Sequence, residues 1–211
     1  MNRAKSQRRF VFACLAPAVI LVALFMFWPT VNVFRMSLYR MGGITNRKEF
    51  IGLQNFKTLM EDKNFLEAMQ NTILIIVMVM IFTIVFAILF AAILQRGKFK
   101  GKNFFRVIFY IPNILSIVVI GGIFGAIYDP SNGLLNTFLE AVHLDFLTHK
   151  WMGEPKIVIY SIIFALVWQA IGYYMVMYMS GMSAIPEDLY EAASLDGSSE
   201  INTFFTVTLP L

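Results

Sequence analysis

Thr72-Ile-Leu-Ile-Ile-Val-Met-Val-Met-Ile-Phe-Thr-Ile-Val-Phe-Ala-Ile-Leu-Phe-Ala-Ala-Ile-Leu94 is a run of 23 residues without a charged side chain. About 20 consecutive apolar residues in a helix cross the hydrocarbon core of a bilayer. Three further apolar blocks reach or approach that length with their flanks, at residues 10–28, 104–127 and 157–184. Only helices and closed barrels pair all their backbone groups in lipid, and these runs lack the alternation of barrel strands. The sequence therefore predicts an all-α, polytopic membrane protein with four transmembrane helices.

Composition agrees with this fold class. The chain is 58% hydrophobic and 14% charged, whereas about a quarter of the residues of an ordinary soluble domain are charged. Its net charge of +4 comes from basic residues that cluster at the edges of the apolar blocks, so nucleic-acid binding has no support. Cys14 is the one cysteine, which excludes a disulfide or a cysteine-based metal site within the chain. We assign no metal and no chemistry to His143 and His149.

Basic residues predict the orientation in the membrane. The loop from Arg96 to Asn103, with the nearby Arg106, carries five positive charges and no acid. Residues 1–9 also carry only basic charges, directly before the first apolar block. Lys and Arg are enriched in cytoplasmic segments. The two segments are separated by two predicted crossings, so they agree with each other, and we expect a cytoplasmic amino terminus with an uncleaved first span whose helix continues toward Tyr39.

The third and fourth spans carry residues that favour particular packing or function. Pro112 predicts a kink in the third span. Gly121 and Gly125 form a small-residue face that suits close approach of a neighbouring helix, either in the same bundle or, as the alternative, in a dimer. The fourth span is polar for its type, because it contains four uncharged polar or aromatic side chains near its middle: Trp168, Gln169, Tyr173 and Tyr174. Such groups at bilayer depth tend to face the protein interior or a water-filled path. Helix–helix contact and lining of a substrate path both remain open for them.

Two loops on the outer side also have predictable local structure. Asp129-Pro-Ser-Asn-Gly133 has the residues of a turn, and a short amphipathic helix is expected from Leu134 toward Leu147. Phe50-Ile-Gly-Leu-Gln-Asn-Phe56 resembles a turn that leads into an amphipathic helix lying at the membrane interface.

Residues 186–210 are acidic where the positive-inside rule favours basic residues. They contain five carboxylates and no Lys or Arg: Glu187, Asp188, Glu191, Asp196 and Glu200. Pro186 suits the first position of a helix, and acids in the first turn complement the helix dipole. Gly197 favours the left-handed conformation that ends a helix, and a second short helix is expected from Ser198 to Phe205. The sequence predicts a cytoplasmic helix–glycine turn–helix whose alanines would let another protein hold it in a groove.

The spacing within this segment resembles a known motif. Glu191-Ala-Ala193, three residues, Gly197, nine residues, Val207, one residue and then Leu209-Pro210 are similar to the EAA loop of binding-protein-dependent ABC importer permeases. Two distant stretches are also similar to this family, Gly52-Leu-Gln-Asn-Phe56 before the second span and Asn71-Thr72 at its start. A third, Asp129-Pro with Gly133-Leu-Leu-Asn136, resembles the subunit type of maltose and glycerol-3-phosphate importers. The resemblance covers nearly the whole chain, although no basic residue follows Gly197.

The resemblance implies a permease subunit and not an enzyme. Residues 10–211 would be a type-1 ABC transmembrane domain, and the motif residues would couple it to an ATPase: Glu191, Ala192, Ala193, Asp196 and Gly197. The chain has no GxxxxGK[ST] loop, so it would bind no cofactor itself, and a cytoplasmic ATPase dimer would hold ATP and Mg²⁺.

The other implied partners are a second homologous permease subunit, an extracytoplasmic solute-binding protein and membrane lipid. The implied location is a bacterial or archaeal inner membrane, with a sugar, oligosaccharide or glycerol phosphate as substrate. Family members continue after the EAA loop, commonly with two more spans, so we expect this chain, which stops at Leu211, to be truncated or partial.

Three alternatives belong to other substrates or classes. Within the same superfamily the substrate could be an amino acid, a peptide or a polyamine. An ion-coupled secondary transporter predicts charged residues inside the spans, yet the four blocks have no Asp, Glu, Lys or His at depth and only Arg106 at an edge. A membrane-embedded enzyme predicts a catalytic constellation near the membrane, and neither a carboxylate pair nor a Ser/His/Asp set lies there.

Overall fold

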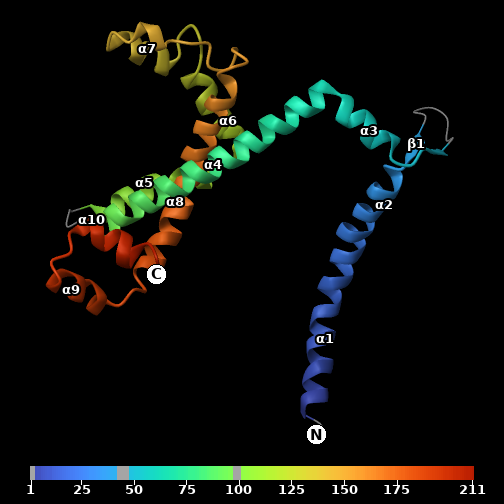
Figure 1. Ribbon diagram of the computed structural model, residues 1–211, viewed down its shortest axis with the longest axis horizontal. Helices are drawn as coiled ribbons and strands as arrows, with labels where there is room; N and C mark the ends of the chain where they lie inside the picture. Colours follow the sequence, from blue (N-terminus) through green and yellow to red (C-terminus); the bar gives the residue numbers. More distant parts are fainter. Residues whose placement is uncertain (1–2, 42–47, 97–100) are drawn as a thin grey trace. The chain divides into compact units, whose positions relative to one another are not determined.

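The computed structural model describes residues 3–41, 48–96 and 101–211, so Lys98 and Lys100 of the predicted basic loop lie outside the described residues. The chain divides into two compact units, Met1–Gln70 and Asn71–Leu211. Helices dominate both units (Figure 1).

The first unit begins with one nearly continuous helix. It consists of α1 (Arg3–Val22), a π-helical turn η1 (Ala23–Phe27) and α2 (Trp28–Met36). The helix thus extends beyond the predicted span 10–28 and stops three residues before Tyr39. A two-stranded antiparallel hairpin follows, in which β1 (Tyr39–Met41) pairs with β2 (Lys48–Phe50).

The predicted turn and amphipathic helix come next in the first unit. Gly52 has φ +56°, a left-handed conformation that glycine adopts easily. The helix α3 (Gln54–Glu61) then begins. The side-chain amide of Asn55 donates to the carbonyl oxygens of Ser37, at 2.7 Å, and Tyr39, at 3.1 Å, which fixes α3 to the start of the hairpin.

The second unit contains the remaining helices. Most of the long helix α4 (Lys63–Arg96) belongs to it, and it is followed by six α-helices and two short turns: α5 (Lys102–Ile114), α6 (Ile117–Ile127), α7 (Leu134–Ala141), η2 (Asp145–Leu147), α8 (Val158–Met182), α9 (Glu187–Leu195), α10 (Glu200–Thr203) and η3 (Phe204–Thr208). Among the described residues, three helices are long and apolar enough to cross a membrane, at Gln7–Met36, Lys63–Gln95 and Val158–Met182. The bent pair α5–α6 gives a fourth if it is counted as one span. The four predicted spans fall on these segments.

The third span is broken more sharply than a proline kink. The axes of α5 and α6 differ by 104°. Pro112 lies in the last turn of α5 and has no N–H to donate to the preceding turn. Leu115 is extended, and Ser116 caps α6 by accepting a hydrogen bond at its Oγ from the N–H of Val119, at 3.4 Å. The serine cap therefore restarts the helix in a new direction.

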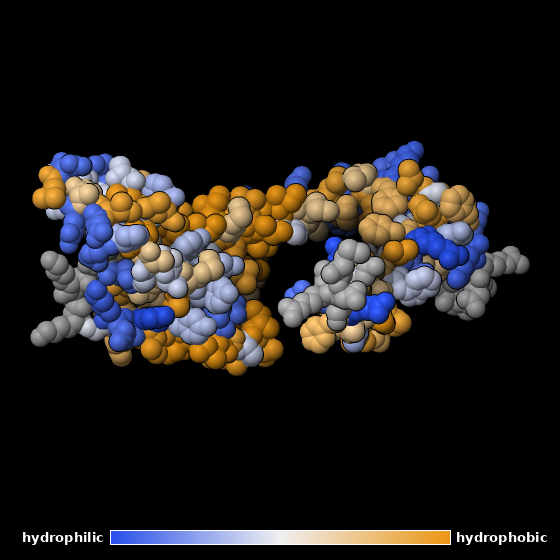
Figure 2. All heavy atoms as spheres, turned by 90° about the horizontal axis from the view of Figure 1, so that it is seen from below, coloured by the Kyte–Doolittle hydropathy of each residue, from blue (hydrophilic) through white to orange (hydrophobic). Residues whose placement is uncertain are grey.

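Two buried clusters hold the second unit together. One joins Ala87, Ala91 and Leu94 of α4 to Met175 and Met179 of α8. The other surrounds the end of α6 and contains Ile120, Phe124 and Tyr128, with Trp151 and Trp168 packed against them. Hydrophobic residues cover the helices of this unit, while hydrophilic residues gather at the end that carries α9 and α10 (Figure 2).

The close helix approach occurs at a different glycine from those predicted. A Cβ atom built on Gly121 or Gly125 meets nothing within 4 Å among the described residues, so no described helix packs closely on that face and its packing role stays a prediction. A Cβ atom on Gly172 of α8 would instead overlap the backbone of Phe109 and Tyr110 in α5. Glycine at position 172 is what allows α5 and α8 to pack along each other.

Candidate functional site: the EAA segment

Residues 186–210, which we call the EAA segment, form the predicted helix–glycine turn–helix. Pro186 has extended backbone (φ −58°, ψ 136°) and caps α9, which begins one residue later than predicted, at Glu187. Glu187 and Asp188 occupy the first turn, where carboxylates interact favourably with the positive end of the helix dipole. Local chemistry therefore explains why the helix begins here.

The turn after α9 is closed by backbone hydrogen bonds. Gly197 has φ +74°. Its N–H donates to the carbonyl of Ser194, at 3.1 Å, and the N–H of Ser198 donates to the carbonyl of Ala193, at 3.0 Å. These two bonds are the Schellman pattern, in which a left-handed residue lets the last carbonyls of a helix find donors. A β-carbon at position 197 would meet no atom within 4 Å, so only the backbone conformation requires glycine in the described structure.

Side-chain hydrogen bonds fix the second arm of the segment. Ser199 caps α10, its Oγ accepting from the N–H of Asn202 at 3.3 Å. Ser198 Oγ lies 2.9 Å from the Asn202 amide and 3.1 Å from the hydroxyl of the buried Thr203. The hydroxyls of Tyr190 in α9 and Thr208 in η3 lie 3.3 Å apart. The two arms therefore form one closed element and are not independent helices.

The outer surface of this element is left open. All five of its carboxylates are exposed, and within the described part of the chain none of them forms an ion pair. Leu195 is 89% exposed and Ile201 is 74% exposed, on either side of the glycine turn. Of the predicted coupling residues, Glu191, Ala192, Asp196 and Gly197 are exposed and Ala193 is half-buried. This combination of acids and bare apolar side chains fits a surface that another protein covers.

The predicted substrate-path residues do not gather at one place. Trp168 is half-buried, and its ring contacts Phe124 edge-on with the ring centres 5.4 Å apart. Tyr173 and Tyr174 are exposed, with ring centres 5.3 Å apart. Gln169 is half-buried. Gln169 and the two tyrosines lie outside both cavities that Trp168 lines, so their role as a path stays a prediction.

These two cavities are strongly apolar. One, of about 550 Å³, lies between α4, α5 and α8 and is lined by Trp168 and a ladder of rings: Phe82, Phe86, Phe90 and Phe109. The other, of about 460 Å³, lies at the end of α6. There the polar atoms of Tyr128, Trp151 and Ser161 already bond within the protein. Sugar hydroxyls need hydrogen-bond partners when they leave water, so neither cavity alone provides a sugar site.

Residues 84–211 match the family described as "Binding-protein-dependent transport system inner membrane component". The chain belongs to this family. The match includes α8, the whole EAA segment and most of the second unit. This permease is therefore a multi-pass membrane component of a transport system, and the family resemblance drawn from its sequence is confirmed.

Individual relatives agree with the family. The permease is 36% identical over 197 residues to the probable ABC transporter permease protein YurN of Bacillus subtilis, and the match covers 93% of this chain and 67% of YurN. It is 29% identical over 210 residues to the diacetylchitobiose uptake system permease protein NgcF of Streptomyces coelicolor, covering 95% and 60% of the two chains. The chain thus spans about two thirds of the length of these relatives.

A solved structure supports the fold. A chain in the crystal structure of a bacterial ABC transporter involved in the import of the acidic polysaccharide alginate superposes with a TM-score of 0.83 and is 25% identical. The superposition covers all of this permease and 71% of the other chain. The arrangement of helices described above is therefore that of an importer subunit.

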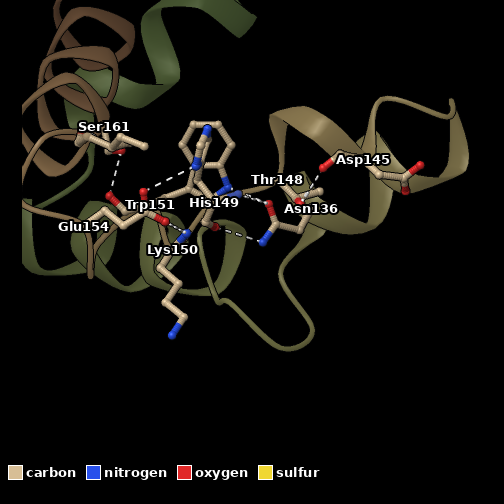
Figure 3. A network of polar contacts seen from close by, with 9 residues as sticks. Asn136, Asp145, Thr148, His149, Lys150, Trp151, Glu154 and Ser161 are labelled. Atoms are coloured by element: carbon tan, nitrogen blue, oxygen red, sulfur yellow. Dashed lines mark hydrogen bonds and ion pairs between the residues drawn. The ribbon is translucent and has the colours of Figure 1, made fainter.

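A polar network at the other end of the second unit was not predicted. Residues 128–161, which we call the α7 cap, are organised around Asn136 (Figure 3). Its Oδ1 accepts from the Trp151 indole N–H, at 2.7 Å, and from the His149 backbone N–H, at 3.4 Å, while its Nδ2 donates to the His149 carbonyl, at 3.1 Å. Ser161 of α8 donates to the Trp151 carbonyl at 2.9 Å. The only signal in the sequence was that Asn136 ends the Gly-Leu-Leu-Asn stretch.

The turn that begins the α7 cap is the predicted one. The Asp129 carboxylate accepts from the backbone N–H groups of Asn132 and Ser131, each at 2.9 Å, and these bonds hold the pKa of Asp129 below its usual range.

His149 Nδ1 lies 3.4 Å from Glu154 Oε2, and His143 has φ +61°. Among the described residues no group of three His, Cys, Asp or Glu side chains could hold a metal ion.

Proposed function

We propose that this permease is a membrane-spanning subunit of an ATP-driven importer that moves a sugar or related carbohydrate into the cell. The family match gives binding-protein-dependent transport. The relative for diacetylchitobiose uptake and the structural neighbour from alginate import both handle saccharides. These two comparisons favour a carbohydrate over an amino acid, a peptide or a polyamine.

In this proposal the amino terminus and the EAA segment lie in the cytoplasm of a bacterium or archaeon. A cytoplasmic ATPase dimer binds ATP and Mg²⁺ and hydrolyses the nucleotide, and the permease hydrolyses nothing. The coupling residues Glu191, Ala192, Ala193, Asp196 and Gly197 present the docking surface. The second structural neighbour, an alginate transporter in complex with a periplasmic protein bound to alginate pentasaccharide, supports a solute-binding protein as a further partner. A second homologous permease subunit completes the path.

Closure of the ATPase dimer would move the EAA segment as a single body. The Schellman turn and the contact between Tyr190 and Thr208 make the segment internally fixed, so a displacement of α9 is passed to the helices on either side of it. Substrate released by the binding protein would then enter a path in which Trp168, Gln169, Tyr173 and Tyr174 are the proposed contacts. Lipid covers the apolar faces of the spans.

One observation carries the proposal: hydrogen bonds join the two arms of the EAA segment, while its carboxylates and Leu195 are exposed. The test is Gly197→Asp in the full-length permease, assembled with its ATPase. An added side chain strains the positive φ and places bulk and charge on the docking surface, so uptake of labelled sugar and stimulated ATP hydrolysis should both be abolished while membrane insertion is unchanged.

Gly52→Asp is the matched control. Gly52 also has positive φ and open space around its Cβ position, but it lies in the first unit. The control variant should therefore keep uptake. Wild-type transport by the Gly197→Asp permease would overturn the proposal.

A further inference from the structure

A side-chain hydrogen bond joins α4 to the residue at which α8 ends. The amide Nε2 of Gln95 in α4 donates to Oγ of Ser183, at 2.9 Å. Ser183 Oγ in turn donates to the carbonyl of Met179, one turn back in α8, at 2.8 Å. Ser183 is the capping residue of α8 and precedes the first residue of α9, Glu187, by four positions. Gln95 therefore contacts the root of the EAA segment.

A third helix is tied to the same point. Lys102 lies at the start of α5, and its Nζ donates to the backbone carbonyl of Gln95, at 3.1 Å. That carbonyl belongs to the last turn of α4, where orphan carbonyl groups and the negative end of the helix dipole favour a cation. The ends of α4 and α8 and the beginning of α5 thus meet through Gln95.

The bond continues a buried seam between the same helices. Ala91 and Leu94 of α4 and Met175 and Met179 of α8 are all buried in one cluster. Gln95 is the next residue after Leu94, and Ser183 lies one turn beyond Met179. The apolar seam sets the distance between the helices, while the directional bond at its end fixes how the root of the EAA segment is held against α4.

We propose that Gln95 is a positioning residue that transmits movement of the EAA segment to α4. The inference rests on the proposed function. The chain itself connects the EAA segment to α8 through residues 183–186, so α8 must follow the segment. The helix α4 is not joined to the segment by neighbouring residues of the chain; it packs on α8 along the buried seam, and the Gln95–Ser183 bond adds a directional contact at the root of the segment. Coupling between distant sites can be carried by packed side chains and hydrogen bonds that have two arrangements, and this bond, with Lys102, adds a polar link to the packing that joins α4 and α5 to α8.

The experiment removes the bond from either side in the full-length, assembled importer in proteoliposomes. Gln95→Met keeps the length of the side chain without its donor, and Ser183→Ala removes the acceptor. The measurement is the ratio of ATP hydrolysis with the substrate-loaded binding protein to basal hydrolysis. We expect each variant to lower this ratio about fivefold, which corresponds to about 1 kcal/mol, the usual net value of one hydrogen bond. Basal hydrolysis and co-purification of the ATPase should stay unchanged.

A double-mutant cycle separates loss of the Gln95–Ser183 bond from unrelated structural effects of each substitution. The double variant should be no worse than either single variant, because both remove the same bond. Ser183→Thr retains a hydroxyl and should restore a ratio close to wild type. Ser180→Ala, at an exposed position of α8, and Gln70→Met, at an exposed position of α4, are matched controls that should leave the ratio unaltered.

The outcomes separate this proposal from the proposed function. Wild-type ratios in Gln95→Met and Ser183→Ala, additive losses in the double variant, or loss of ATPase from the purified complex would each overturn the role of Gln95. Those results would leave transport by the wild-type permease and its loss in Gly197→Asp untouched. Absence of sugar uptake by the wild-type importer would overturn the proposed function itself.

Discussion

The α7 cap and the EAA segment are both polar regions at the ends of the second unit, yet they use their polar groups in opposite ways. In the α7 cap, Asn136 is only 9% exposed and all three of its hydrogen bonds stay within the chain. In the EAA segment the hydrogen bonds hold the two arms together, while the carboxylates and Leu195 face outward without contacts that bury them.

The difference shows which of the two regions has its contacts within the described chain and which leaves side chains for a partner to cover. A buried polar group that has its partners holds a fixed shape, whereas an exposed apolar side chain gains free energy only when something covers it. Substitutions in the α7 cap should therefore reduce stability. Substitutions on the outside of the EAA segment should reduce association with a partner.

The largest effect on stability is expected in α8, the helix that connects the α7 cap to the EAA segment. Gly172→Ala would place a methyl group into the backbone of Phe109 and Tyr110, so α5 and α8 would have to separate. Overpacking of this kind costs about 3 kcal/mol or more when backbone must move. The melting temperature of the purified permease should fall, and binding of the ATPase should fall with it.

Gly181→Ala is the control for this change, because a Cβ atom there meets nothing within 4 Å. It substitutes the same residue type in the same helix and should melt close to wild type. Equal melting temperatures for the two variants would contradict the importance of the contact between α5 and α8.

The next effect tests the α7 cap. Asn136→Ala removes three hydrogen bonds and leaves the Trp151 indole N–H and the backbone groups of His149 without their partner. Unpaired buried groups cost about 1–3 kcal/mol each, partly offset by water. We expect about 2 kcal/mol of lost stability by this reasoning, measured by thermal unfolding, with unchanged affinity for the ATPase. The exposed Asn132→Ala is the matched control, and an equal loss in both variants would argue against the network.

The opposite pattern is expected for Leu195→Ala in the EAA segment. The side chain is 89% exposed, so unfolding of the isolated permease should change by less than about 0.5 kcal/mol. If the ATPase covers it, truncation removes about 1.5 kcal/mol of burial, which is roughly a tenfold weaker complex. Titration of the ATPase onto wild-type and variant permease in nanodiscs measures this, and unaltered affinity would mean that Leu195 lies outside the docking surface.

Local sequence chemistry predicted the features that depend on neighbours in the chain. The length of the apolar runs predicted the spans, and Asp129 and Gly133 predicted the turn before α7. Gly197 gave the end of α9 because only a left-handed residue lets Ser198 and Gly197 donate back to the helix. These structures form from contacts within a few residues, so the sequence contains their causes directly.

Features that depend on distant partners were missed or misplaced. Proline in the third span predicted a kink, but the 104° break also needed the cap of Ser116. Small residues predicted close packing at Gly121, whereas the close contact among the described residues lies at Gly172, since which face of a helix meets a neighbour is decided by tertiary arrangement. Asn136 became a hub only because Trp151 and His149 are brought to it by a loop. The docking role of the EAA residues rests on the resemblance and stays a prediction.

The smallest expected effect distinguishes the two regions by pH. The backbone N–H groups of Asn132 and Ser131 bond the ionised carboxylate of Asp129 and lower its pKa in the folded state below the ordinary value of 3.8. A lowered folded-state pKa means that the ionised form stabilises the fold at pH values above 3.8, and that this stabilisation is lost as the pH falls through the folded-state pKa. Asp129→Asn should therefore melt below wild type by a constant margin from pH 7 to about pH 5.

Below about pH 5 the difference in melting temperature should shrink, because the wild-type carboxyl becomes protonated and is then uncharged, like the amide of the variant. Asp145→Asn, in the same cap, replaces a carboxylate whose side chain does not hold the turn and should show no comparable margin. A margin for Asp129→Asn that stays the same at pH 2.5 would mean that the turn depends on the shape of the side chain and not on its charge. The α7 cap would then differ from the EAA segment in packing alone.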